Sequence, residues 1–176
     1  MSKRILLFLI LSFMMFSCEK VDKLTQFNMN FDSEITIPAT FGINIPVDIW
    51  TPDIPTNSTT TFESNNTTKD LIEQIVLKKM EMTIKTEGAS WDFLKSIEIY
   101  ISANGVEEIM IAWLNDIPQN GLTKIDLNTS SQDLKEYIKA DSYKLRTKTI
   151  TRQIISKDTD VKIRSTFFVD AKILGI

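Results

Sequence analysis

The sequence predicts an all-β protein, an antiparallel β-sandwich, and three observations predict it. Apolar and polar residues alternate over many short segments, which is typical of strands that bury one face and expose the other. Turn residues separate these segments at short intervals, as in sandwiches rather than in parallel α/β folds. A long stretch of the chain also repeats with similar local patterns, so the sandwich is expected to consist of two tandem units.

The duplication rests on the octapeptide that begins at Trp50 and recurs at Trp113. Trp, Asp, Ile, Pro and Asn are identical in both copies at one offset of 63 residues (113 − 50). The same offset, without a gap, still aligns Lys85-Thr86 with Lys148-Thr149. We therefore predict two repeat units, at about 41–103 and 104–173. In each, a strand, an Asp-Ile-Pro loop, a short strand, one short helix and a further strand follow one another.

The strands are predicted from alternation with period two. Pro46 cannot donate a backbone hydrogen bond, so its strand is expected at a sheet edge or at a bulge. Asn104-Gly105 is the strongest hairpin signal in the chain. The strand that follows it is apolar on both faces and is expected to be central. The predicted strands are 27–37, 41–49, 60–64, 80–86, 97–103, 106–114, 125–127, 143–149 and 161–173.

Two short helices are predicted, at 67–75 and 131–139. Thr67 or Thr68 can cap the first, and its apolar residues Leu71, Ile72 and Ile75 share a helical face. The second carries Leu134, Tyr137 and Ile138 on one face. We expect the two helices to cover opposite, pseudo-symmetric openings of the sandwich.

The composition excludes several classes of function. The chain has no His and a single Cys, so intrachain disulfides, Ser-His-Asp and Cys-His catalysis, and zinc sites built on His or Cys are absent. A net charge of −3 provides no electrostatic surface for nucleic acid. No glycine-rich phosphate loop is present. We expect a non-enzymatic protein with no cofactor, no metal and no nucleic-acid partner.

The N-terminus has the features of an export signal. Lys3 and Arg4 precede an apolar run, Ile5 to Phe16, which is too short to span a bilayer comfortably. The run ends at Met15-Phe16-Ser17-Cys18, which resembles the lipobox of bacterial lipoproteins. The resemblance implies that Cys18 becomes the mature N-terminus and carries acyl chains such as palmitate. Two or more chains on one residue give stable membrane anchoring.

The same resemblance extends to location. Glu19 follows Cys18, and an Asp there would be the inner-membrane retention signal in the best-known system. Because Glu19 is not Asp, the analogy implies the outer membrane. The whole chain looks like the small lipoproteins of Gram-negative envelopes, a likeness that transfers no site residues. The expected organisation is a signal peptide at 1–17, a polar tether at 18–25 and the sandwich domain at 26–176.

The two Asp-Ile-Pro loops, after Trp50 and after Trp113, contain several of the candidate residues. We interpret them as structural turns, because Asp and Asn bond to nearby backbone and Pro restricts the residue before it. Two alternatives remain: a pair of catalytic carboxylates, Asp53 with Asp116, and calcium binding by Asp53 with Asn57 or by Asp116 with Asn120. The turn residues are Asp53, Pro55, Asn57, Asp116, Pro118 and Asn120.

The candidate ligand contacts are aromatic and basic. Trp50 and Trp113 are suited to stacking on sugar rings, although a buried plug beneath each loop is the favoured interpretation. The strand at 143–149 carries a basic face, interpreted as a solvated edge strand or as a contact for lipid phosphates or anionic glycans. That face consists of Lys144, Arg146, Lys148 and Arg152.

The preferred functional hypothesis is a membrane-anchored accessory or binding lipoprotein of the cell envelope that contacts an envelope protein. A carrier of lipid or another apolar ligand is the first alternative and requires an internal apolar cavity of roughly 300 Å³ or more. Glycan binding through Trp50 or Trp113 is the second and requires exposed rings. A carboxylate-dependent hydrolase is the third and requires two acids within about 10 Å.

Overall fold

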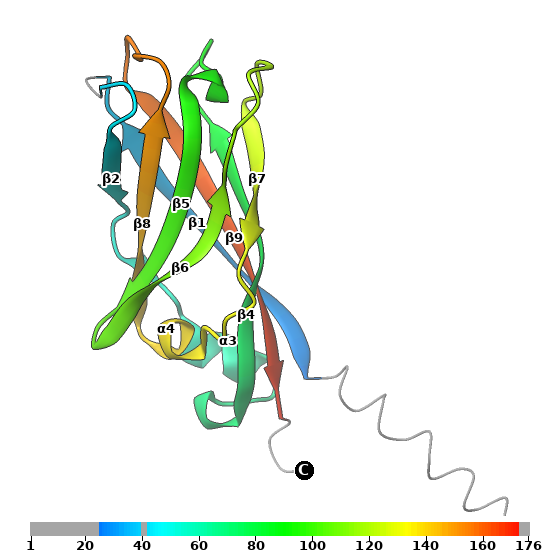
Figure 1. Cartoon of the computed structure of the whole chain (residues 1–176). Coiled ribbons are helices and arrows are strands. Elements are labelled where there is room, and N and C mark those ends of the chain that lie inside the picture. Colours follow the sequence, from blue (N-terminus) through cyan, green and yellow to red (C-terminus); the bar gives the residue numbers. More distant parts are fainter. Residues whose placement is uncertain (1–24, 40–41, 173–176) are drawn as a thin grey trace, which may run out of the picture.

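The computed structural model describes residues 25–39 and 42–172. The predicted signal peptide and most of the predicted tether, Cys18 included, lie outside these residues. The described chain is an antiparallel β-sandwich formed by one curled sheet (Figure 1). Its strands are β1 (Gln26–Ile37), β2 (Pro46–Trp50), β3 (Ile54–Pro55), β4 (Ile72–Ile84), β5 (Leu94–Ala103), β6 (Val106–Leu114), β7 (Lys124–Thr129), β8 (Ser142–Thr151) and β9 (Thr159–Ala171).

The strand order in the sheet is β1-β9-β4-β7-β6-β5-β8-β2, and β3 pairs with β8. The first four strands form one layer and the last four form the other. The layers are joined where β6 meets β7 through only two pairs, Ala112 with Thr129 and Trp113 with Asn128. Because β1 and β2 stand at the two ends of the order, they are the free edges of the described sheet. All pairings between strands are antiparallel, as alternation predicts.

The core lies between the two layers and consists of the inward-facing residues of the strands. Residues from β5 and β8 face residues from β4 and β9, and an aromatic cluster is formed by residues of β1, β8 and β9. Phe31, Tyr143 and Phe167 pack edge to face, with ring centroids 5.5–6.1 Å apart. Fully buried aliphatic side chains surround them, among them Ile97, Ile99, Ile101, Leu145, Ile163 and Val169.

The predicted helix at 67–75 is wrong. Only Lys69–Leu71 forms a short 3₁₀ turn, η2, and β4 begins at Ile72. Two register shifts in β4, between Ile72 and Gln74 and between Leu77 and Lys79, insert extra residues into the strand. Buried residues therefore recur three apart, as at Ile72 and Ile75, and this spacing imitates a helical face.

The short strand predicted at 60–64 is also wrong, because Ser58–Ser64 is a helix, α3. Asn57 adopts a left-handed conformation with φ of 47°, which turns the chain after β3. The turn places Phe62 at the end of the sandwich, where it is fully buried and lies 6.2 Å from the Phe27 ring. Burial of this side chain outweighs the strand preference of the Thr-rich segment.

The second predicted helix is present but shorter, as α4 (Lys135–Lys139). Each predicted repeat unit thus contains one α-helix, but α3 and α4 do not occupy equivalent positions at the offset of 63. Residues 72–77 of β4 coincide instead with 135–140, which include α4. The two helices lie at the same end of the sandwich and not at opposite openings (Figure 1). The duplication itself stays a prediction.

The edges of the sheet differ in part from expectation. Pro46 lies in the edge strand β2, as predicted. The Asn104-Gly105 hairpin and the central position of β6 are also confirmed. The basic strand β8 was interpreted as an edge, and this is wrong, because β5 and β2 pair with its two sides. Its outward side chains therefore lie in the middle of a sheet face.

The core assignment makes a direct prediction about Ile101, which is fully buried on the inward face of β5. Ile101→Asp would place an unpaired carboxylate in the core, and we expect a loss of more than about 4 kcal/mol in the free energy of unfolding. The matched control is Ser102→Asp, since Ser102 pairs with Lys144 on the outward face. Thermal denaturation followed by circular dichroism checks both variants. An unchanged melting temperature for Ile101→Asp would contradict the assignment.

Candidate ligand-binding surface

The outward face of β2, β8, β5 and β6 brings aromatic and charged residues together in two neighbouring rows. In the first row, strand register aligns Trp50 with Arg146, Arg146 with Tyr100, and Tyr100 with Met110. The second row aligns Asp48, Lys148, Glu98 and Trp113 in the same way. We call this surface the outer-face cluster. It comprises Asp48, Trp50, Glu98, Tyr100, Glu108, Trp113, Arg146 and Lys148.

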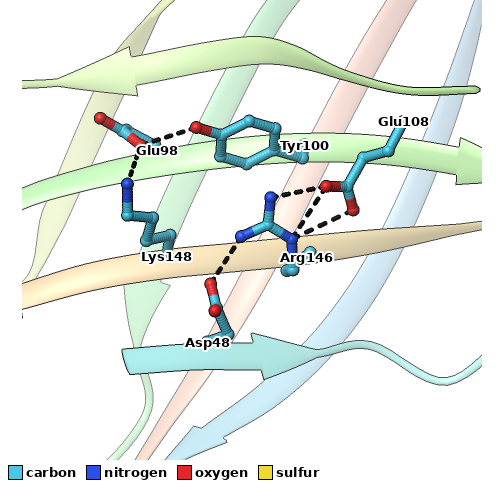
Figure 2. A network of polar contacts seen from close by, with 6 residues as sticks. All are labelled: Asp48, Glu98, Tyr100, Glu108, Arg146 and Lys148. Atoms are coloured by element: carbon cyan, nitrogen blue, oxygen red, sulfur yellow. Dashed lines mark hydrogen bonds and ion pairs between the residues drawn. The ribbon is translucent and has the colours of Figure 1, made fainter. Parts of the chain in front are cut away.

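Arg146 is the centre of the outer-face cluster (Figure 2). Its guanidinium donates to Glu108 through Nε and Nη2, and to Asp48 Oδ1 through Nη1 at 2.6 Å. The guanidinium carbon lies 4.1 Å from the ring centroid of Tyr100 and 5.8 Å from that of Trp50. Hydrogen bonding to Glu108, and then to Asp48, raises the pKa of Arg146 above its usual range. A permanently charged, planar group is thus fixed between two aromatic rings.

A second set of contacts fixes Glu98 (Figure 2). The Tyr100 hydroxyl donates to Glu98 Oε2 at 2.8 Å, and Lys148 Nζ donates to the same oxygen at 3.2 Å. The hydrogen bond from Tyr100, followed by that from Lys148, lowers the pKa of Glu98 below its usual value of 4.5. The same bond to Glu98 raises the pKa of the Tyr100 phenol. Glu98 is therefore ionised at neutral pH.

Three of the basic residues predicted as contacts, Lys144, Arg146 and Lys148, are already paired with carboxylates. Lys148 pairs with Glu98, Arg146 pairs with two acids, and Lys144 Nζ lies 3.6 Å from Asp53 Oδ2. Arg152 donates to the carbonyl of Ile117 at 2.8 Å. A surface whose cations are already paired offers little attraction to lipid phosphate or to an anionic glycan.

The tryptophans differ from one another. Trp50 is 51% exposed, so its interpretation as a buried plug is wrong. The reason is its place on the edge strand β2, where the side chain faces outward and no further strand covers it. Trp113 is half-buried beside Asn128. Trp91, by contrast, is fully buried in η3 (Trp91–Phe93) and donates through Nε1 to the Thr123 carbonyl at 3.1 Å.

The two Asp-Ile-Pro loops lie at opposite ends of the sandwich. The first loop lies at the end of β5, because Asp53 borders a hollow together with Asn104, the residue after β5. The second lies at the start of β5, because Ile117 donates its backbone N–H to the Lys95 carbonyl. The length of β5 separates the loops by about 30 Å. Asp53 and Asp116 therefore do not form a catalytic pair, for which about 10 Å is the limit.

The predicted turn residues lie where the backbone changes direction in each loop. Ile54 and Ile117 are buried, and the left-handed conformation occurs at Asn57 and Asp116, with φ of 47° and 52°. Pro55 lies in β3, which pairs with β8. Pro118 and Asn120 are exposed in the loop after β6. Among the described residues, no group of three or more acids, histidines or cysteines is arranged to hold a metal ion.

The surface also contains a groove, which we call the seam groove, where the free edges β1 and β2 approach one another. Its volume is about 480 Å³, within the range of small-molecule sites. Trp50 forms part of its wall and so belongs to both the groove and the outer-face cluster. The lining residues are Glu34, Ile35, Thr36, Trp50, Pro52, Lys85, Asp160 and Val161.

Two smaller hollows are present. One, of about 280 Å³, is lined by residues of Gly88–Phe93 and Gln153–Thr159. The other, of about 210 Å³, is lined by residues that include Asp53 and Asn104. Like the seam groove, each has exposed polar residues in its lining. None of the three is the closed apolar chamber that a lipid carrier requires. Within the described part of the chain, the helices are all too short or too polar to cross a membrane.

The sequence predicted four members of the cluster as candidate contacts, Trp50, Trp113, Arg146 and Lys148, but neither its acids nor Tyr100. Asp48, Glu98, Tyr100 and Glu108 were not singled out. Asp48, Glu98 and Tyr100 do occupy the polar positions of predicted alternating strands, which is the one signal that pointed to them. The signal was insufficient because the order of the strands in the sheet was unknown.

No family model and no curated protein matches this chain. Solved structures similar to it include N-glycanase F (PNGase F), with a TM-score of 0.46 and 12% identity over 83% of this chain. The chain spans 42% of that protein's length.

Two further structures cover most of this chain. The decameric BFDV capsid protein has a TM-score of 0.40 and 7% identity, and covers 84% of this chain and 99% of its own. CpGH89CBM32-5 from Clostridium perfringens, solved with GalNAc-β-1,3-galactose, has a TM-score of 0.38 and 7% identity, and covers 81% and 97%. Similarities this distant concern the fold alone and identify no ligand for this chain.

The contacts of Glu98 predict how its pKa changes when the Tyr100 hydroxyl is removed. Tyr100→Phe removes the main donor, so we expect the Glu98 pKa to rise toward its usual value of 4.5. A carboxyl group whose pKa is lowered by folding stabilises the folded state at pH values above its usual pKa. This stabilisation is lost as the pH falls through the lowered pKa. The variant should therefore lose less stability than the wild type on acidification below pH 4.5.

Nuclear magnetic resonance titration of the glutamate side chains checks this prediction. Tyr137→Phe is the control, since the Tyr137 hydroxyl donates to the Glu107 carbonyl and does not reach Glu98. It should leave the Glu98 titration unchanged. An unchanged Glu98 pKa in Tyr100→Phe would show that the bond at 2.8 Å does not persist in solution.

Proposed function

We propose that this chain is a non-enzymatic, lipid-anchored binding protein of the cell envelope and that its outer-face cluster binds a neutral glycan. The anchor is the acylated Cys18, which holds the domain at the outer membrane. The observation that carries the binding proposal is the row formed by exposed Trp50, Arg146 and Tyr100. Aromatic rings offer an apolar surface for the C–H faces of a sugar, and the neighbouring polar groups suit its hydroxyls.

The order of the cluster supports binding at low entropic cost. Arg146 is 16% exposed and is held by two carboxylates, and Glu98 is held by Tyr100 and Lys148. Side chains that are already fixed lose little freedom when a ligand arrives. The carboxylates retain unused lone pairs toward solvent, which can accept hydrogen bonds from hydroxyl groups.

The charge balance supports a neutral ligand over an anionic one. The cluster contains three carboxylates, Asp48, Glu98 and Glu108, against two cations, Arg146 and Lys148. Both cations already have acidic partners. Sulfated or phosphorylated glycans would meet a net negative surface and gain no unpaired cation there.

The position of the domain relative to the anchor is compatible with this role. β1 begins at the end of the sandwich where α3, α4 and the last described residues also lie (Figure 1). The eight tether residues 18–25 reach at most about 29 Å when fully extended. The outer-face cluster lies along the side of the sandwich, so an anchor at one end leaves this face open to solvent.

The anchoring proposal is tested by Cys18→Ala in the native host. We expect the wild type to incorporate labelled palmitate and to fractionate with membranes, because several acyl chains bind a bilayer stably. Cys18→Ala should incorporate no label and remain unprocessed or be released. Ser17→Ala keeps a small residue before the cysteine and serves as the control. Normal processing and membrane retention of Cys18→Ala would refute lipidation.

The binding proposal is tested by electrophoresis in native gels that contain a polysaccharide. Four neutral polysaccharides (mixed-linkage β-glucan, galactomannan, xyloglucan and glycogen) are compared with anionic alginate. We expect at least one neutral polysaccharide to retard the wild type, and alginate not to. Trp50→Ala should weaken the binding at least tenfold, equivalent to about 1.4 kcal/mol, because it removes the exposed ring.

The control for that experiment is Ile154→Ala, because Ile154 is an exposed apolar residue in a loop away from the cluster. It should migrate as the wild type does in every gel. Lack of retardation by all four neutral polysaccharides would overturn glycan binding while leaving the lipid anchor intact.

A further inference from the structure

The seam groove has an architecture suited to a second sugar-binding position. Its floor is lined by two buried core residues, Ile35 at 5% exposure and Val161 at 0%, at the place where the two edges of the sheet do not pair. Trp50 and Pro52 form an apolar wall. The groove thus combines this floor and wall with four polar residues at its rim, Glu34, Thr36, Lys85 and Asp160.

The polar rim is held in place by contacts between strands. Lys85 donates its backbone N–H to the Asp160 carbonyl at 2.8 Å, and Asp160 donates its own to Thr86 Oγ1 at 2.8 Å. The Thr36 hydroxyl donates to Asp160 Oδ1 at 2.7 Å. The rim is therefore anchored to β1, β4 and β9, and its side chains project from a rigid part of the sandwich.

The charged groups of the rim differ from those of the outer-face cluster in one respect. Neither the Lys85 ammonium nor the Glu34 carboxylate forms a salt bridge with any residue that the structure describes. Lys85 supplies three donors and Glu34 supplies acceptors. Hydroxyl groups both donate and accept, so a sugar ring can use both without carrying a charge.

Trp50 joins the two surfaces. It is the wall of the seam groove, and Arg146 of the outer-face cluster lies 5.8 Å from the centroid of its ring. From these contacts we infer that the seam groove is a second sugar subsite, continuous with the outer-face cluster across Trp50. The ligand is then a neutral chain of several sugar units and not a monosaccharide. This inference rests on the proposed function and specifies the length of its ligand.

The inference is tested by isothermal titration calorimetry with two fragments of the neutral polysaccharide that retards the wild type most. The fragments are its disaccharide and its hexasaccharide. We expect the hexasaccharide to bind the wild type at least tenfold more tightly. Lys85→Ala and Glu34→Gln should each weaken hexasaccharide binding at least fivefold and leave the affinity for the disaccharide unchanged.

Each variant has a matched control. Lys95→Ala removes another exposed lysine without a salt bridge, and Glu136→Gln neutralises an exposed glutamate in α4, at the end that carries both helices. Neither should change the affinity for either fragment. Equal affinity of the two fragments, or unchanged hexasaccharide binding in both groove variants, would overturn the inference and leave glycan binding at the cluster standing. Absence of retardation by every neutral polysaccharide would overturn both.

Discussion

The packing of inward-facing side chains between the two layers is the constraint on which the rest of the structure depends. Side chains alternate strictly between the faces of a strand, so burying Ile97, Ile99 and Ile101 forces Glu98 and Tyr100 outward. The same rule on β8 buries Leu145 and turns Lys144 and Arg146 toward the outer face. The outer-face cluster is therefore a consequence of the core register, and a slip of one residue in either strand would destroy both.

Within the cluster, Arg146 determines the arrangement of its neighbours. Its guanidinium contacts residues from three other strands: Asp48 and Trp50 on β2, Tyr100 on β5, and Glu108 on β6. Only a planar group with several donors can satisfy two carboxylates while stacking on aromatic rings. Salt bridges on exposed surfaces contribute little to stability, so the value of this arrangement lies in fixing the positions of the rings and acids. A fixed polar surface beside an exposed tryptophan is what a binding role requires.

The incomplete closure of the sheet gives the second feature of functional interest. Because β1 and β2 are free edges that do not pair, a groove lies between them with the buried residues Ile35 and Val161 at its floor, and Trp50 is left uncovered. Natural sandwiches protect such edges against pairing with other chains, and Pro46 on β2 has this effect here. The edge that is protected from aggregation is thus also the place where the outer-face cluster and the seam groove meet.

The sequence by itself determined the fold class, most strands, the Asn104-Gly105 hairpin and the edge position of Pro46, because each depends on local alternation or on one residue's backbone chemistry. It also supplied Trp50, Arg146 and Lys148 as candidates. Only the tertiary structure decided the rest. The bulges in β4 changed a two-residue period into a three-residue one, and burial of Phe62 against Phe27 made a helix of a Thr-rich segment. Strand order, which no local pattern encodes, placed β8 inside the sheet and brought Asp48, Glu98 and Glu108 to Arg146 and Lys148 from distant parts of the chain.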